Sequence, residues 1–390
     1  MTDSSPLVQA TGEYSQVPPD WMSATGGHAL VFEDPALIWL KYHGPAHGFE
    51  PDSSPYEFLD FIAAKGQQFE DQWAREMAPE AIQVCTPAYQ VHSPAKVRET
   101  FALMQKGAPV IIQGALWWAP ERIYGVPDLL VHTSWLESKL PDVARSLGLK
   151  GQAAHYIVFD LKFTSKLESA PKAAALRSYA AQVRVYSYML GHLQGVMPQK
   201  GFLVTRDRIW DPVAIDITST LGQPLDEDLA ALRDRFVEIK LNGAQYTPWQ
   251  DAIVASNIGH HDNQWYSAKK IIAYEKTPGR DPAIVRGIGQ EAKRDLASKG
   301  FPTLDSLLAA DPETIPLEEC HNLGPARALR IRTMLQANRA GVPVLPAATP
   351  RPPHKEYEFY IDFEYFSKAV VNFKRQWPTL DGCEMIFMVG

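Results

Sequence analysis

The stretch His155-Tyr-Ile-Val-Phe-Asp160-Leu-Lys162-Phe-Thr-Ser-Lys166 places a carboxylate and an ammonium group two residues apart in an otherwise apolar segment. Its apolar content predicts a β-strand, in which alternate side chains point to opposite faces, so Asp160 and Lys162 share one face. Charges inside an apolar strand lose hydration unless they are partnered, and a divalent cation held by the carboxylate would be such a partner. A solvated edge strand with a chance Asp-x-Lys pattern is the alternative interpretation.

A second apolar strand is predicted upstream, at residues 128–131, after a turn at Gly125 and Pro127. The first side chain of this strand is the carboxylate of Asp128. If the two strands are neighbours, each of them delivers an aspartate to the same place. Mg²⁺ and Mn²⁺ prefer oxygen ligands and usually keep some water, so two or three carboxylates are enough to bind either ion.

Two predicted helices carry further polar residues. In the first, at residues 56–73, apolar side chains recur at helical spacing and Glu70 lies at the edge of the apolar stripe. There, Glu70 either points into a cleft or is an ordinary exposed side chain, and this segment alone does not distinguish the two. In the second, at residues 178–190, Gln182 and Tyr186 are four positions apart and therefore share a face.

Four motifs follow one another along the chain: Gly66-x-x-x-Glu70, Gly125-x-x-Asp128, Asp160-x-Lys162 and Gln182-x-x-x-Tyr186. This ordered set resembles the PD-(D/E)xK nuclease superfamily, and the trailing Gln/Tyr helix resembles its RecB-like branch. The resemblance implies an α/β fold with a restriction-endonuclease-like mixed sheet flanked by helices. It also implies that Gln182 and Tyr186 brace the catalytic site and contact the nucleic-acid backbone.

The resemblance further implies a metal-dependent nuclease, a hydrolase acting on the phosphodiester bonds of DNA. Asp128 and Asp160 would bind Mg²⁺ or Mn²⁺ together with the backbone carbonyl of Leu161. Glu70 would complete the coordination directly or through water. Lys162 would orient or activate the attacking water, and hydrolysis would leave a 5′-phosphate.

Two features of RecB-like relatives are missing from the sequence. Some relatives add a metal-binding histidine from the helix before the first acidic motif, but residues 56–77 contain none. Several relatives hold an iron–sulfur cluster with four cysteines. This chain has only Cys85, Cys320 and Cys383, without CxxC spacing, so we expect neither a cluster nor a cysteine zinc site.

Composition bounds the class of protein. The 390 residues suffice for two or three domains, and 45% hydrophobic content is ordinary for globular proteins. No 18-residue apolar run or signal-peptide pattern is present, and the unclustered cysteines suit a reducing cytosol, so a soluble cytoplasmic protein without a membrane partner is expected. The net charge of -7 gives no general attraction to nucleic acid, so such binding requires local basic surface.

Local basic surface is predicted around the Asp-x-Lys strand. Between positions 160 and 208, basic residues outnumber Asp160, Glu168 and Asp207; they are Lys162, Lys166, Lys172, Arg177, Arg184, Lys200, Arg206 and Arg208. This stretch would flank the scissile phosphate, with Lys166 and Arg184 as nucleic-acid contacts. A solvated helix face with spare lysines is the alternative.

A helical region is predicted at residues 246–341. Within it, Gly287-Ile-Gly289 lies between helical segments, and a tight Gly-x-Gly exposes backbone amides that can hold a phosphate. The segment resembles a helix-hairpin-helix module, which implies sequence-independent DNA binding at Gly287, Gly289 and Lys293. A weaker second copy follows, with positive charge from Arg327, Arg330 and Arg332. A plain helical hairpin used for packing or for docking a partner is the alternative.

The final segment follows a run of prolines at residues 342–355, which predicts a semi-rigid linker. Beyond it, Asp362 and Glu364 lie on one face of a predicted strand, and another strand is expected near the end. This resembles the opening of an RNase H-like (DEDD-type) exonuclease domain, whose first motif is a metal-binding Asp-x-Glu. Because about 35 residues cannot bury a core, we expect the chain to end inside a domain, as a truncated product, with this incomplete second site silent.

The expected organisation has a disordered N-terminus at 1–26, a nuclease domain at 27–245, the helical module at 246–341, the linker at 342–355 and the incomplete RNase H-like segment at 356–390. The expected partner is DNA, single- or double-stranded, with RNA left open. The competing interpretation is a non-catalytic nucleic-acid-binding or assembly protein on a degenerate nuclease fold. Clustered carboxylates count against it, because a phosphate-binding surface gains nothing from negative charge without a metal.

Overall fold

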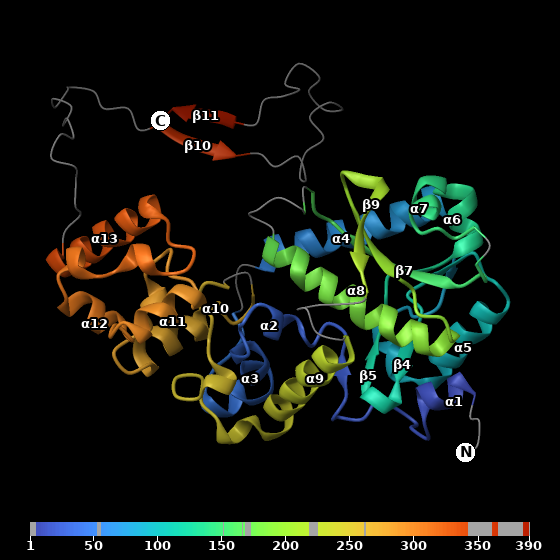
Figure 1. Cartoon of the computed structure of the whole chain (residues 1–390), viewed down its shortest axis with the longest axis horizontal. Helices are drawn as coiled ribbons and strands as arrows, with labels where there is room; N and C mark the ends of the chain where they lie inside the picture. The colour runs from blue at the N-terminus through green and yellow to red at the C-terminus, as the bar shows by residue number, and fades with distance from the viewer. Residues whose placement is uncertain are drawn as a thin grey trace. The chain divides into compact units, whose positions relative to one another are not determined.

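A computed structural model of the chain describes residues 5–52, 56–150, 152–165, 167, 173–217, 225–260, 263–341 and two strands at 361–365 and 385–389. The chain divides into two compact units, Met1–Ala340 and Gly341–Gly390 (Figure 1). Within the described residues, no helix is both long and apolar enough to cross a membrane.

The first unit is mixed α/β, as the sequence predicts, and its largest sheet has six strands in the order β2-β3-β6-β7-β8-β9. The strands are β2 (Ile82–Gln83), β3 (Val110–Ile112), β6 (Leu129–His132), β7 (Tyr156–Lys162), β8 (Lys200–Thr205) and β9 (Arg208–Asp216). Strand β7 pairs antiparallel with β6 and parallel with β8, so it lies inside a mixed sheet. The expected strand at the Asp-x-Lys motif is therefore a central one.

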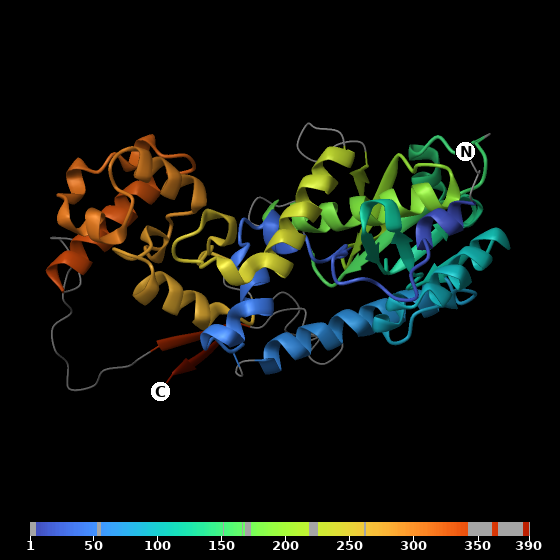
Figure 2. The ribbon, with the colours of Figure 1, turned by 90° about the horizontal axis from the view of Figure 1, so that it is seen from below.

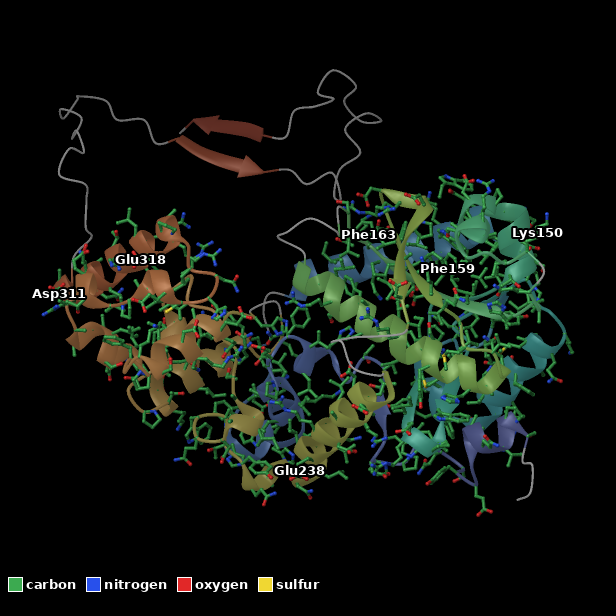
Figure 3. All side chains as sticks on the ribbon, in the orientation of Figure 1. Lys150, Phe159, Phe163, Glu238, Asp311 and Glu318 are labelled. Atoms are coloured by element: carbon green, nitrogen blue, oxygen red, sulfur yellow. The ribbon has the colours of Figure 1, made fainter. Side chains whose placement is uncertain are left out.

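Strand β7 separates two apolar cores because its buried side chains alternate between the faces of the sheet. On one face, Val158 packs in the core that contains the buried residues of α8 (Ala173–Gln194). On the other, Phe159 (Figure 3) stacks on Phe202 of β8 with ring centroids 4.8 Å apart. That second core also takes in side chains of α4 (Tyr56–Met77), α6 (Thr133–Lys139) and α7 (Pro141–Ser146). Helices thus flank both faces of the sheet.

The N-terminal residues are part of the fold. Residues 5–26 contribute α1 (Pro6–Thr11) and β1 (Met22–Ser23), and β1 pairs with β5 (Ile123–Gly125) next to β4 (Leu116–Trp118) in a second sheet. Trp21 is 1% exposed and its ring contacts that of Trp117 at 5.4 Å between centroids. The prediction of disorder is wrong for residues 5–26, because the few apolar side chains of this polar segment are buried against β4.

The first unit contains further helices, of which α2 is short. They are α2 (His28–Val31), α3 (Ala36–His43), α5 (Pro94–Gln105) and α9 (Leu225–Asn242). Helices α3 and α9 pack on one another, and α2 packs on α8. Helix α2 therefore lies against the helix that covers the Asp-x-Lys face of β7.

The described residues between 263 and 341 form a helical module, as expected. Its helices are α10 (Tyr266–Ile271), which continues as a π-helical turn, α11 (Gln290–Ser298), α12 (Leu304–Ala309) and α13 (Pro325–Ala340). Leu296, Leu307 and Ile331 are fully buried in a core of their own. Figure 2 shows these helices at one end of the first unit, beyond α2, α3 and α9. The module and the sheet region, expected as separate domains, belong to one compact unit.

The second unit contains β10 (Ile361–Tyr365) and β11 (Met385–Val389), which pair antiparallel. Asp362 and Glu364 face Met388 and Ile386 in this pairing, so they are alternate residues of one strand. Their side chains, and the linker prolines, lie outside the described residues. The metal-binding role implied for them stays a prediction.

Candidate active site

The register of two strands brings Asp128 and Asp160 together. In the antiparallel pairing of β6 and β7, Leu129 faces Phe159, so the preceding residue, Asp128, faces Asp160. The Leu161 amide donates a hydrogen bond of 2.7 Å to Asp128 Oδ2. Since side chains directly opposite one another have Cβ atoms about 4.5–5.5 Å apart, the two carboxylates predicted to meet are neighbours.

Lys162 lies on the same face and pairs with Asp160. Its Nζ is 2.6 Å from Asp160 Oδ2, and the side chains are 19% and 1% exposed, respectively. The other oxygen, Asp160 Oδ1, is buried and has no hydrogen-bond partner in the part of the chain that the structure describes. A buried carboxylate oxygen without a donor is costly, so Asp160 Oδ1 is a candidate ligand position.

The charges of three acidic residues interact at this point. The pKa of Glu70, on α4, is raised to about 7 by burial, with Asp160 adding to the rise and Lys162 opposing it. Burial and then Asp160 raise the pKa of Asp128 well above its ordinary value, and Glu70 contributes in the same direction. Each of these shifts includes the charge of another carboxylate, so Glu70, Asp128 and Asp160 act on one another electrostatically.

The pKa of Lys162 shifts in the direction that favours its charged form. Burial lowers its pKa, but the attraction of Asp160 and Asp128 outweighs burial, so the net pKa is raised. The ammonium group therefore stays protonated at neutral pH. Its Nζ also lies 5.2 Å from the ring centroid of Tyr179, on α8, at a distance typical of a cation–π contact.

Gln182 and Tyr186 lie beneath this cluster on α8. Gln182 Nε2 donates to the Tyr186 hydroxyl at 2.9 Å, and the residues are 6% and 3% exposed. A Cβ at Gly125 would lie 2.5 Å from Tyr186 Cε1, so glycine is what allows the end of β5 to approach this ring. Burial and then Asp160 raise the pKa of Tyr186, which places it near the carboxylates. The pair is positioned to brace the site; its contact with a nucleic-acid backbone stays a prediction.

His28, the first residue of α2, is a member of the site that the sequence analysis missed. Its Nε2 is buried without a hydrogen-bond partner among the described residues. Burial, followed by the charge of Lys162, lowers its pKa to about 4, while Asp160 opposes the change. His28 is thus neutral at neutral pH, the form in which imidazole binds metals. No local pattern in the sequence marks this residue, because its approach to the cluster depends on the packing of α2 on α8.

Arg184 and Lys166 are the two residues near the site that are predicted to contact nucleic acid. Arg184, on α8, donates from Nε to the Asp216 carbonyl at 2.9 Å, and burial lowers its pKa. One edge of its guanidinium is therefore used within the fold. Lys166 lies outside the described residues. Both contacts stay predictions.

The residues predicted to bind nucleic acid in the helical module are near one another. Gly287 has a φ of +110°, which favours glycine, and Gly289 is the N-cap of α11. Lys293 Nζ lies 2.5 Å from Asp281 Oδ2, so this lysine already has an anionic partner. A phosphate at Lys293 would have to compete with Asp281.

The donor groups of the carboxylate–lysine cluster suit a divalent cation in part. Across the described ranges, no three His, Cys, Asp or Glu side chains are placed so that they could together hold a metal ion. The donor chemistry fits one: Asp160 Oδ1 and His28 Nε2 are buried and unpartnered. The raised pKa values of Glu70 and Asp128 also reflect crowded negative charge, which a cation would relieve.

The class of site is thus a carboxylate–lysine cluster, with a neutral histidine beside it, on the central strand of a mixed sheet. The comparisons with known protein families and with curated proteins find no match. Its chemistry is therefore argued from the residues of this chain.

Proposed function

We propose that the chain is a metal-dependent nuclease that hydrolyses phosphodiester bonds in DNA. The observation that carries this proposal is the register of β6 and β7, which sets Asp128 opposite Asp160 with the Lys162 ammonium 2.6 Å from Asp160 Oδ2. Paired carboxylates beside a lysine suit the binding of a hard cation next to a phosphate.

Five groups would hold Mg²⁺ or Mn²⁺: the carboxylates of Asp128, Asp160 and Glu70, His28 Nε2 and the backbone carbonyl of Leu161. When bound, the cation supplies positive charge against the negative charge that develops on the phosphate. Asp160 Oδ1 supports this assignment because it is buried without a donor.

The other residues position the reacting groups. Lys162, which the carboxylates keep protonated, donates a hydrogen bond to the attacking water or to a phosphate oxygen, and it cannot take up the proton of the water. Gln182 and Tyr186, on α8, brace the carboxylate–lysine cluster. Attack of the water on phosphorus breaks the bond to the 3′ oxygen, which takes a proton from solvent; the attacking water gives its proton to a carboxylate or to solvent, and a 5′-phosphate and a 3′-hydroxyl remain.

The competing function is a non-catalytic nucleic-acid-binding or assembly role. The crowded carboxylates argue against it, because keeping three of them together costs free energy through desolvation and repulsion and repels a phosphate backbone. A lysine held among them adds nothing to a binding surface that is otherwise acidic.

A cleavage assay on end-labelled linear, circular, single- and double-stranded DNA tests the proposal. We expect cleavage with Mg²⁺ or Mn²⁺, loss of it with a chelator, and a drop of about 10²–10³-fold in Lys162→Ala. Lys150→Ala, which removes an exposed lysine from the same region (Figure 3), is the control and should cleave like the wild type. Metal-independent binding without any cleavage would favour the competing function.

A further inference from the structure

A groove with a volume of about 1670 Å³ lies beside the carboxylate–lysine cluster. His28, Ser178 and Tyr179 line it on the side of the cluster, and Gly287, Gly289 and Arg327 line it in the helical module. Small-molecule sites measure about 300–1,000 Å³, so this groove has room for a longer ligand. We propose that it binds a single strand of nucleic acid that continues from the cleaved phosphate to the helical module, an inference that rests on the proposed function.

The groove is continuous with the candidate active site. Tyr179 lines the groove, and its ring centroid lies 5.2 Å from Lys162 Nζ. His28 also lines it, and the charges of Lys162 and Asp160 act on its imidazole. A strand whose phosphate reaches the cluster would therefore pass directly into the groove.

The charges of the groove suit a polyanion. Its basic side chains are Lys41, Arg177, Arg184, Arg235 and Arg327, and its acidic ones are Glu33, Asp228 and Glu291. None of these five basic residues forms an ion pair with a carboxylate in the described ranges, whereas Glu33 is paired with Arg294. Unpaired cations facing a groove attract phosphates even when the whole chain carries a net negative charge.

The aromatic lining favours a single strand over a duplex. Phe32, Tyr42, Tyr179, Phe236 and Trp265 line the groove; Phe236 and Trp265 are 5% and 6% exposed, whereas Tyr42 is 38% exposed and presents its ring to a ligand. Aromatic rings bind unpaired bases by stacking, whatever the sequence. The faces of the bases are hidden in a duplex, so these rings would have no matching surface there.

A buried hydroxyl and an open stretch of backbone line the groove. Ser178 is 1% exposed, and its hydroxyl has no hydrogen-bond partner among the described residues although it lines the groove. At the other side, a Cβ on Gly289 would meet nothing within 4 Å, so the backbone there is open to a ligand. Both features are suited to polar groups of a bound strand.

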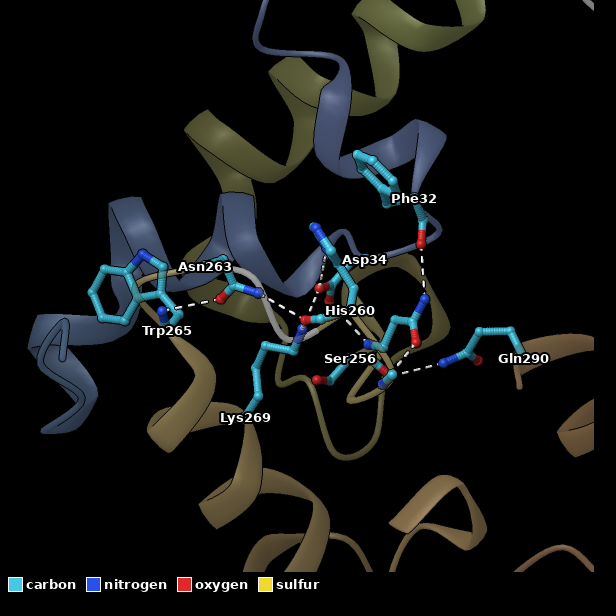
Figure 4. Close-up of polar contacts among 10 residues, drawn as sticks. Phe32, Asp34, Ser256, His260, Asn263, Trp265, Lys269 and Gln290 are labelled. Carbon is cyan, nitrogen blue, oxygen red and sulfur yellow. Dashed lines mark hydrogen bonds and ion pairs between the residues drawn. The ribbon is translucent and has the colours of Figure 1, made fainter. Parts of the chain in front are cut away.

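The two walls of the groove are fixed to each other by a buried network (Figure 4). Asp34, which is fully buried, accepts hydrogen bonds from the Asn257 amide at 2.9 Å and from His260 Nδ1 at 3.1 Å, and it pairs with Lys269 of α10. Because Asp34 follows α2, this network ties the helical module to the segment that carries His28. The groove is thus formed before a strand binds.

Binding of fluorescent oligothymidylates of about 4 to 20 nucleotides to the full chain, measured by anisotropy in EDTA, tests the inference. We expect affinity to rise with length and to exceed that for a duplex of equal length. Arg327→Glu should weaken binding of the longest oligonucleotide about 10-fold and spare the shortest. Arg339→Glu, on the same helix but outside the groove, should leave both unchanged.

A second pair of variants tests stacking. Tyr42→Ala should weaken binding of single strands about 10-fold, whereas Tyr89→Ala, which removes a tyrosine that is 69% exposed elsewhere, should have no effect. Preference for duplex, or equal effects within either pair of variants, would overturn the groove assignment. Because binding is measured without metal, loss of strand binding in a chain that still cleaves defeats only this inference, and strand binding without cleavage defeats only the nuclease.

Discussion

Two Asp–Lys pairs of the described residues, Asp34–Lys269 and Asp160–Lys162, differ in how fully they are partnered. In the joint between α2 and the helical module, both oxygens of Asp34 have partners, and the side chains of Asp34 and Lys269 are 0% exposed. In the candidate active site, Asp160 Oδ1 has no partner among the described residues, and Lys162 is 19% exposed. Complete pairing is typical of a structural contact, whereas an unfilled position marks a place for a ligand.

The pKa values of the two lysines show the same contrast. Burial lowers the pKa of Lys269, and Asp34 only partly offsets it. The pKa of Lys162 is raised, because Asp160 and Asp128 both attract its charge. One lysine does not cancel the negative charge of several carboxylates around it. The remaining negative charge is favourable only where a further cation binds.

The largest expected effect separates the two pairs by activity. Asp160→Asn should reduce the kcat/KM for DNA cleavage by about 10²–10³-fold or more, because it removes a proposed metal ligand while keeping the size of the side chain. Asp34→Asn should leave the kcat of the folded fraction near the wild-type value, because Asp34 belongs to the network between the walls of the groove and not to the carboxylate–lysine cluster. Steady-state kinetics, corrected for the folded fraction by circular dichroism, checks this. Comparable losses in both variants would break the comparison.

Stability should separate the pairs in the other direction. Lys269→Met leaves Asp34 buried without its cation, so we expect the free energy of unfolding to fall by about 3–5 kcal/mol. Lys270→Met changes the exposed neighbour on the same helix and should stay within about 0.5 kcal/mol of the wild type. Urea denaturation of the two variants measures the difference. If the two variants unfold at the same urea concentration, the pair of Asp34 and Lys269 does not stabilise the contact between α2 and the helical module.

Strand β7 was predictable from sequence because its signal is local. Alternation of side chains along residues 156–162 alone places Asp160 and Lys162 on one face, and the structure has them there. To predict that Asp128 lies near Asp160, one must also assume that their two strands are neighbours. The pairing of β6 with β7 agrees with that assumption.

Other features depend on contacts that the local sequence does not encode. His28 reaches the cluster only because α2 packs on α8, more than a hundred positions further along the chain. Asp34 and Lys269 are 235 positions apart. The N-terminal segment was predicted to be disordered because its composition is polar, yet Trp21 and Met22 are buried. In each case tertiary packing outweighs local composition.

Metal binding should act on one pair only. We expect Mn²⁺ to raise the melting temperature of the wild type, since a ligand at 100 times its Kd adds about 2.7 kcal/mol of stability. The rise should be absent in Asp128→Asn and present in Asp34→Asn, because only Asp128 belongs to the carboxylate cluster. Differential scanning fluorimetry with and without Mn²⁺ measures it. A rise that survives in Asp128→Asn would place the ion elsewhere.

A third ion pair, in the helical module, sharpens the comparison because it is exposed to solvent. Hydrogen bonds from Arg332 lower the pKa of Glu318 (Figure 3) from 4.5 to about 2. A lowered pKa in the folded state adds stability above the unfolded value, and that stability is lost as the pH falls from about 4.5 to about 2.

Glu318→Gln should therefore lower the melting temperature slightly at pH 7, and the difference from the wild type should shrink towards zero as the pH approaches 2. The effect is the smallest of the set because water screens an exposed pair. Thermal unfolding of both proteins across this pH range, with the exposed Glu275→Gln of the same module as a control, gives the measurement. A difference that is constant with pH would show that packing of the Glu318 side chain, and not its charge, stabilises the module.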